Sequence, residues 1–154
     1  MSYATAAEML RAVGSERLKR LIPDFQADSL TSRLDEALVV GAGKIESRIG
    51  HVYATPLALS AIVDAGQKAS AEAQLRRVNI LFALEYLTLG VDKLPPGITS
   101  GIAAADAWLS AIAGRKARIP GLSPTNRPVM KAFAPEGEVQ NPLDNAIFEG
   151  FAFL

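Results

Sequence analysis

The chain has 154 residues, and its 16 basic and 16 acidic side chains cancel, so no overall charge attracts it to nucleic acid or to a membrane. It contains no cysteine, which excludes disulfides, thiolate metal sites and a cysteine nucleophile. Hydrophobic residues make up 49% of the sequence and aromatic residues only 6%, a composition that favours one helical domain with a core of its own.

Two short helices are predicted at the N-terminus. Thr5 stands three residues before Glu8, which is the spacing of a capping box, so a helix is expected from Ala6 to Val13. Ser15 then offers an N-cap to a second helix, which Pro23 stops. Helices this short are not stable alone, so both must pack on the remainder of the domain.

The longest amphipathic pattern runs from Ser29 to about Ile49, where apolar residues recur at helical spacing. Gly41 and Gly43 inside it each cost about 1 kcal/mol relative to alanine. We attribute both glycines to the close approach of another helix. The stretch GAGK that contains them lacks the preceding strand, the glycine spacing and the hydroxyl residue of a phosphate loop, so it is interpreted as helix.

The central element is the stretch 75–90, whose apolar residues cover nearly the whole circumference of a helix. Such a helix is expected to be buried on all sides. We predict that it begins at Ser70, ends at Leu89 and carries the pair Arg76–Arg77 in an exposed first turn. The preceding residues 57–68 fit either a turn or two of helix or an irregular segment.

No segment is predicted to enter a membrane. The stretch 75–90 is shorter than the ~20 residues that a span requires, and Glu85 lies near its middle. The first ten residues lack the basic region and apolar run of a secretory signal. A protein that is made and used in a cytoplasm is therefore expected.

A last helix is predicted from about Ile98 to Ala113. After Gly114 the composition of the sequence changes. Residues 115–154 hold five of the nine prolines and no helical period. We therefore predict a helical domain over 1–114 and an extended, proline-rich C-terminal arm over 115–154. The fold class expected is all-α, a small bundle of about four to five helices around a buried central helix.

The arm ends in large apolar residues that are costly to leave in water, which indicates docking on the same domain, a neighbouring copy or a partner. We take these residues as the subunit-binding or partner-binding candidates: Ile147, Phe148, Phe151, Phe153 and Leu154.

Charge in the arm is divided between a basic first part and an acidic second part. The cations are Arg115, Lys116, Arg118, Arg127 and Lys131, and the acids are Glu136, Glu138, Asp144 and Glu149. The cations could lie near DNA phosphates without sequence specificity, or they could pair with the acidic end of the same or a neighbouring chain. Contact with a subunit or partner is the favoured alternative.

The sequence offers no convincing catalytic or metal-binding set. His51 is the single histidine and follows a predicted helix end, where it can meet the helix dipole or a backbone carbonyl. The carboxylates of Asp35, Glu36 and Glu46 have the spacing of a solvated face. No serine lies in a nucleophile elbow. We therefore expect no enzymatic activity, no cofactor and no metal.

Three stretches, taken in order, resemble the Mu-like phage and prophage proteins of the head-tail connector type. They are MSYATAAEMLRAVGSERLKRL, LDEALVVGAGKIESRIGHVYATPL and LRRVNILFALEYL. The family's pattern at the end of the long helix is matched by Ile45, Ser47, Ile49, Tyr53, Pro56 and Leu57. Its pattern at the end of a later helix is matched by Trp108, Leu109, Ile112, Ala113 and Gly114.

The resemblance covers roughly residues 1–122 and implies a helical adaptor of the virion neck, assembled in the host cytoplasm. It implies a dodecameric ring of neighbouring copies beneath the portal protein, with a tail-side neck or terminator protein below and DNA in the lumen. Residues 57–73 are longer than the family pattern leads one to expect, and so is the chain beyond 122. The alternative function is a helical DNA-binding or regulatory protein that uses the basic segment 115–131.

Overall fold

The structure is a computed structural model that describes residues 2–22, 30–89 and 94–125. These residues form helices and connecting turns, with no strand among them, so the predicted all-α class is confirmed. The elements are α1 (Ala6–Val13), α2 (Ser15–Leu21), α3 (Leu30–Ile49), the 3-10 turn η2 (Leu59–Ala61), α4 (Ala65–Leu87) and α5 (Pro96–Ala113). No helix in the described ranges is long and apolar enough to cross a membrane.

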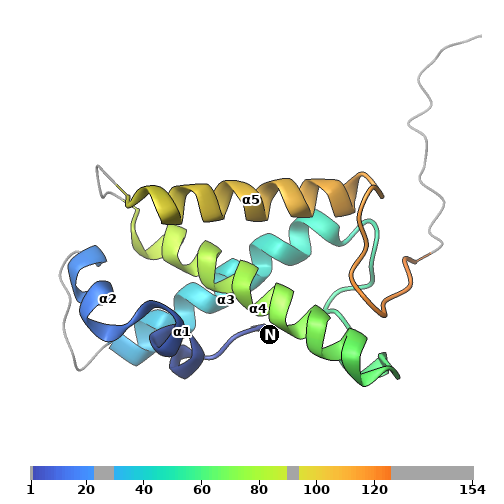
Figure 1. Ribbon diagram of the computed structural model, residues 1–154, viewed down its shortest axis with the longest axis horizontal. Coiled ribbons are helices and arrows are strands. Elements are labelled where there is room, and N and C mark those ends of the chain that lie inside the picture. Colours follow the sequence, from blue (N-terminus) through green and yellow to red (C-terminus); the bar gives the residue numbers. More distant parts are fainter. Residues whose placement is uncertain (1, 23–29, 90–93, 126–154) are drawn as a thin grey trace, which may run out of the picture.

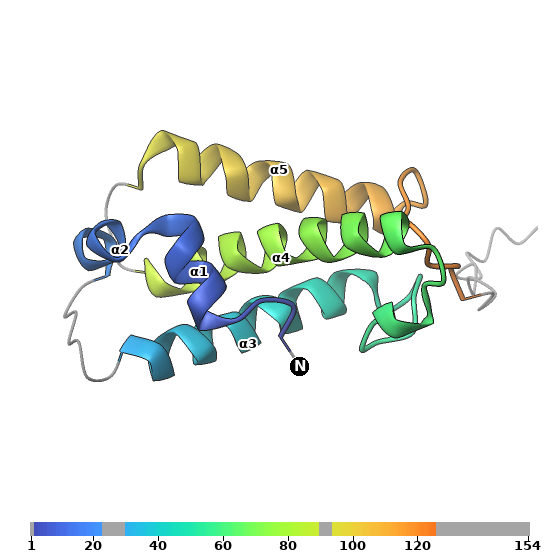
Figure 2. The same ribbon diagram turned by 60° about the horizontal axis from the view of Figure 1, so that its bottom comes forward.

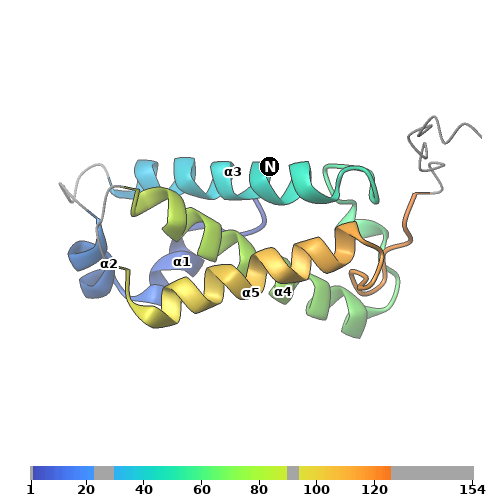
Figure 3. The ribbon, with the colours of Figure 1, turned by 90° about the horizontal axis from the view of Figure 1, so that it is seen from above.

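The long helices are stacked with α4 in the middle (Figure 2). It has its largest contact with α3 on one side and also packs against α5. Seen from above, α5 crosses over α4 (Figure 3). The short helices α1 and α2 form a corner at one end of the bundle, beside the start of α3 and the end of α4 (Figure 1). The prediction of a small bundle around a central helix is therefore confirmed.

The N-terminal corner begins with the predicted capping box. The backbone N–H of Glu8 donates to the Thr5 hydroxyl at 3.3 Å, and the Thr5 N–H donates to the Glu8 carboxylate at 2.9 Å. Gly14, with φ +87°, turns the chain into α2. The predicted cap at Ser15 is wrong, because Ser15 is already the first helical residue and Gly14 holds the cap position without a side chain. Pro23 lies outside the described residues.

The two glycines of α3 have different surroundings. A Cβ added at Gly41 would lie 2.8 Å from Asn79 Oδ1 and 2.9 Å from the backbone O of Asn79, so α4 approaches α3 closely at this point. The predicted explanation is confirmed there. It is wrong for Gly43, because no atom lies within 4 Å of a Cβ at that position.

The start of α4 differs from the prediction. The ambiguous residues 57–68 contain η2 and then the first turn of α4, which begins at Ala65 rather than Ser70. Asp64 caps the helix, since its carboxylate accepts a 2.6 Å hydrogen bond from the N–H of Gln67. The Arg76–Arg77 pair consequently lies well inside α4 and not in its first turn.

Burial of α4 is extensive but not uniform. Its buried residues are Ala71, Leu75, Val78, Asn79, Ile80, Phe82, Ala83, Leu84 and Leu87. Leu81 and Tyr86 are only partly covered, and the side chain of Leu89, beyond the helix end, is 69% exposed. The prediction of burial on all sides is therefore wrong for these residues, which leave apolar surface in contact with solvent.

The buried residues form two clusters, one at each end of the bundle. The first cluster joins α1 and α2 to the start of α3, the end of α4 and Ile98 of α5. The second joins the end of α3, residues 71–82 of α4 and the later turns of α5, and it includes Ile119, which is 1% exposed. Ile119, which belongs to the predicted arm 115–154, therefore packs against the helices. The predicted remainder of the arm, 126–154, lies outside the described residues.

Candidate interaction surfaces

The predicted cation cluster is partly within the described chain. Arg115, Lys116 and Arg118 follow the end of α5 and are exposed to solvent. Arg127 and Lys131 lie outside the described residues, as do the arm candidates Ile147, Phe148, Phe151, Phe153 and Leu154. In the described ranges no carboxylate forms an ion pair with the three exposed cations.

The end of α5 places these cations through a specific backbone turn. The N–H of Arg115 donates to Ile112 O at 2.9 Å, and the N–H of Lys116 donates to Ala111 O at 2.7 Å. This is a Schellman arrangement, which needs a left-handed residue just past the helix. That residue is Arg115, with φ +57°, while Gly114 before it has an ordinary φ of −78°.

His51 lies where the sequence predicted it, at a backbone carbonyl. Its Nε2 is 3.1 Å from Ala113 O at the C-terminal end of α5, and the side chain is exposed. The described part of the chain holds no group of histidine, aspartate and glutamate residues that could bind a metal ion. The contact is consistent with a structural role, in which the imidazole joins the turn after α3 to the end of α5.

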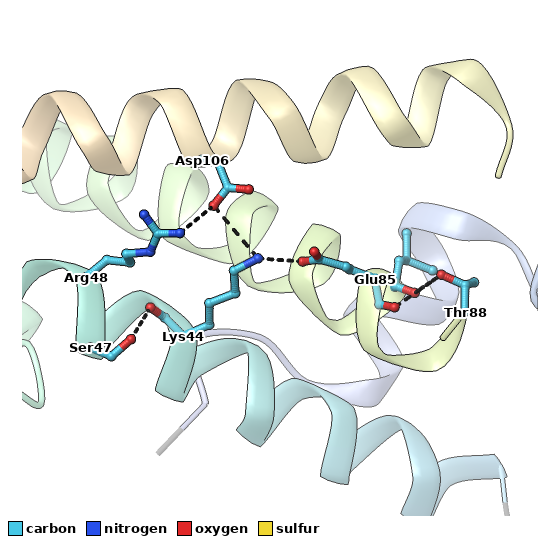
Figure 4. A network of polar contacts seen from close by, with 7 residues as sticks. Lys44, Ser47, Arg48, Glu85, Thr88 and Asp106 are labelled. Carbon is cyan, nitrogen blue, oxygen red and sulfur yellow. Dashed lines mark hydrogen bonds and ion pairs between the residues drawn. The ribbon is translucent and has the colours of Figure 1, made fainter. Parts of the chain in front are cut away.

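A polar network that the sequence did not reveal connects the three long helices (Figure 4). The ammonium of Lys44 on α3 lies 2.6 Å from the Glu85 carboxylate on α4 and 3.8 Å from Asp106 on α5. Arg48 reaches the same Asp106 oxygen at 3.7 Å. Lys44 also lies 4.1 Å from the centroid of the Phe82 ring, a cation–π contact. Because every carboxylate faces a cation, we interpret this network as a structural connection between helices.

A groove of about 370 Å³ lies between the α1–α2 corner, α4 and the start of α5. Its lining is mainly apolar, with arginines as its charged members. The lining residues are Ala12, Val13, Arg17, Ala73, Arg76, Arg77, Ile80, Leu81, Leu84 and Ile98. We call this hollow the arginine groove.

The charges at the arginine groove are unevenly compensated. Arg76 Nε lies 3.0 Å from Glu8 Oε1, an ion pair without the geometry of a hydrogen bond. Hydrogen bonding from the Thr5 backbone, and to a lesser extent its hydroxyl and the nearby Arg76, lowers the pKa of Glu8 below its ordinary value. Arg17 and Arg77 are exposed and have no ion pair with a described carboxylate. The groove therefore has a net positive rim.

A second hollow, of about 330 Å³, lies beside the first between α4 and α5. It shares Arg77 and Leu81 with the arginine groove. Its other lining residues are Gln74, Val78, Gly101, Ala104, Ala105 and Trp108. The two hollows adjoin at these shared residues, and together we call them the α4 groove. Each has the volume of a ligand pocket, typically ~300–1,000 Å³.

A smaller hollow, of about 190 Å³, lies between α3 and α4. Its rim includes Val40, Tyr86 and Leu89, which we call the α3–α4 patch. Val40 is 42% exposed. The Tyr86 hydroxyl donates a 3.1 Å hydrogen bond to Glu36, and this bond raises the pKa of Tyr86. The patch combines exposed apolar surface with a fixed aromatic ring, which is a common composition of protein interfaces.

Comparisons with protein-family models, with curated proteins and with solved structures found no match to this chain. No family is therefore assigned to it by these comparisons. The resemblance to head-tail connector proteins stays a prediction based on the sequence motifs. The hollows and the polar network could not be found by sequence reasoning, because each is formed by residues from helices that are distant in the chain.

Proposed function

We propose that this chain is a structural subunit of the virion neck of a tailed phage or prophage, which assembles as a ring and joins the portal to the tail. The observation that carries the proposal is the ordered series of connector-like motifs. Its apolar members lie together in the second core cluster: Ile45, Ile49, Tyr53, Leu57, Leu109 and Ile112. Because these motif residues pack into one core, the motifs specify a fold. This supports a shared architecture with the connector proteins.

Two separate surfaces with exposed apolar residues support assembly. The α4 groove and the α3–α4 patch are separate surfaces, because their hollows share no lining residue. A ring subunit needs two different surfaces, because each copy contacts one neighbour with one side and the next neighbour with the other. The two surfaces meet that requirement, and the ring would remove Leu89 and Val40 from water.

The exposed cations at the end of α5 are compatible with a DNA-filled lumen. Arg115, Lys116 and Arg118 extend from one end of the bundle, and their charge is not neutralised by described carboxylates. Such a surface attracts phosphates without reading sequence. In the proposed ring these side chains line the channel or contact an acidic partner.

The mass of the purified protein, measured by light scattering alone and after mixing with the portal protein of the same genome, tests the proposal. The expected result is a ring, or a subunit that joins the portal in fixed stoichiometry. A stable dimer that ignores the portal would contradict it.

A matched pair of variants sharpens this experiment. Replacing Val40 and Leu89 with serine is expected to weaken assembly while leaving the helical fold intact, because both side chains are exposed. The control is Val63→Ser, since Val63 is 99% exposed and belongs to none of the hollows described above. Equal assembly by all three proteins would exclude the α3–α4 patch as a subunit interface.

The second candidate function is a helical DNA-binding or regulatory protein, and the exposed Arg115, Lys116 and Arg118 are the observation that favours it. Binding of duplex DNA by a small oligomer, with an affinity that falls steeply as salt rises, would support this function over the ring. Replacing the three cations with glutamine would then abolish binding without changing the oligomeric state.

A further inference from the structure

The side chains that line the α4 groove indicate what kind of segment can bind in it. Its floor is apolar, its rim carries Arg17, Arg76 and Arg77, and no acidic residue lines either of its two hollows. Among the described residues, Arg76 is the one of these arginines with a carboxylate partner, Glu8. A segment that fills this groove should therefore combine large apolar side chains with negative charge and carry no cation.

One segment of the chain has this composition. Residues 144–154 contain Asp144 and Glu149, no basic residue, and a set of apolar residues. The apolar residues are Ile147, Phe148, Phe151, Phe153 and Leu154. Both the charge and the apolar content complement the α4 groove, whereas the earlier tail residues 115–131 carry five cations and no acid.

The attachment point allows this segment to reach the groove of its own chain. Thr125 is fixed to the domain by two hydrogen bonds to Val52 O, from its N–H at 2.8 Å and from its hydroxyl at 2.9 Å. Between Thr125 and Asp144 the chain can extend over about 60 Å, at ~3.3 Å per residue. The 23-residue α4 is only about 35 Å long, at ~1.5 Å per residue. Every part of the groove is within reach.

The covalent connection also determines whether the groove binds the segment of its own chain or that of another copy. A covalent connection of this length gives an effective concentration on the order of millimolar. A second copy offers the same contacts at only the concentration of the protein, which is micromolar or lower in ordinary experiments. The chain's own segment therefore occupies the groove first.

We propose that in the free subunit residues 144–154 dock in the α4 groove of the same chain. The phenylalanines cover the apolar floor and the Trp108 hollow, and Asp144 and Glu149 face the arginine rim. The docked segment covers the groove until another partner displaces it. This inference does not depend on the proposed ring, since it concerns the isolated chain.

Trp108 provides the measurement, because it is the single tryptophan of the chain and lines the groove. Its fluorescence and its quenching by neutral acrylamide are compared in the full chain and in the full chain with Asp144→Lys and Glu149→Lys. The charge-reversed variant is expected to show emission at longer wavelength and stronger quenching. A chain that stops at residue 143 should behave in the same way, and a synthetic peptide of residues 144–154 should reverse its change.

Two controls separate docking from a general charge effect. Glu136→Lys with Glu138→Lys makes the same change of charge outside the docking segment, and it should leave Trp108 unaffected. Arg17→Glu with Arg77→Glu should release the native segment and weaken peptide binding roughly tenfold, as expected for reversed charge pairs of this strength. Combining the arginine reversals with Asp144→Lys and Glu149→Lys should restore protection of Trp108.

Three results would overturn the proposal. The first is unchanged Trp108 quenching in both the charge-reversed and the shortened chains. The second is an equal effect of the reversals at 136 and 138. The third is protection that grows with protein concentration, which would place the segment in the groove of another copy. None of these outcomes is produced by failure of the proposed neck function.

Discussion

Arg115 is the one non-glycine residue in the described ranges with a positive φ. Its left-handed conformation closes the Schellman turn after α5, and for a residue with a Cβ that conformation costs about 1–2 kcal/mol. The turn therefore carries a strain that glycine would relieve.

Arg115→Gly is expected to raise the free energy of unfolding by about 1 kcal/mol, less than the full strain because glycine gains entropy in the unfolded chain. Urea unfolding followed by circular dichroism measures the change. Arg115→Ala is the control, since it removes the same charge but keeps the Cβ. A similar gain with alanine would assign the effect to repulsion among the cations.

Tyr3 makes stability depend on alkaline pH. Burial, and next the 2.9 Å hydrogen bond that its hydroxyl donates to Glu46, raise the pKa of Tyr3 well above its ordinary value of 10.0. Above pH 10 the unfolded chain loses this proton while the folded chain keeps it, so the raised pKa makes the free energy of unfolding fall as the pH rises.

Tyr3→Phe is expected to lower stability by about 1 kcal/mol at neutral pH, through loss of one hydrogen bond. It should also make stability less sensitive to pH from about pH 10 upward. Urea unfolding across this range measures both effects. The same alkaline decline in Tyr3→Phe as in the native chain would contradict the assignment.

Among the helices, the α3–α4 contact gives a matched test at two glycines. Alanine at Gly43 has free space around its Cβ, so Gly43→Ala is expected to stabilise by about 1 kcal/mol through helix propensity. Alanine at Gly41 meets the Asn79 backbone, so Gly41→Ala should destabilise by about 1–3 kcal/mol. Thermal unfolding of both variants measures the difference, and an equal gain at both positions would show that α4 does not press on Gly41.

Local sequence patterns predicted where the helices lie better than they predicted which residues make contact between helices. Thr5 and Glu8 stand within one turn, so the sequence alone was enough to place the start of α1. The start of α4 was missed because the Asp64 cap precedes polar and small residues without an apolar period. The ion pair of Lys44 with Glu85 joins different helices, and no local pattern encodes which side chains will meet after packing.

For the whole molecule, the class of fold followed from periodicity, whereas its surfaces did not. Apolar stripes show which residues leave water, and they correctly indicated a helical bundle around α4. The α4 groove depends on how α5 crosses α4 and where the α1–α2 corner sits. Those arrangements are set by the fit of many side chains, so the groove and its arginine rim appear only in three dimensions.

The α1–α2 corner is expected to open before the remainder of the bundle. Its helices are 8 and 7 residues long and depend on tertiary contacts, whereas α3 and α4 belong to both core clusters. Native-state hydrogen exchange should show lower protection for amides of α1 and α2 than for those of α3 and α4. Equal protection throughout would indicate that the corner and the long helices unfold as one unit.

The division of the core into two clusters also sets an order for folding during synthesis. Every buried residue of the first cluster lies between Ala4 and Ile98, whereas the second needs side chains as late as Ile119. The ribosome synthesises the chain from its N-terminus. Once Ile98 has been added, the first cluster has all its buried residues, whereas the second still lacks its residues from α5. We therefore expect the first cluster to fold before the domain is complete. The later turns of α5 then pack on helices α3 and α4, which are already folded.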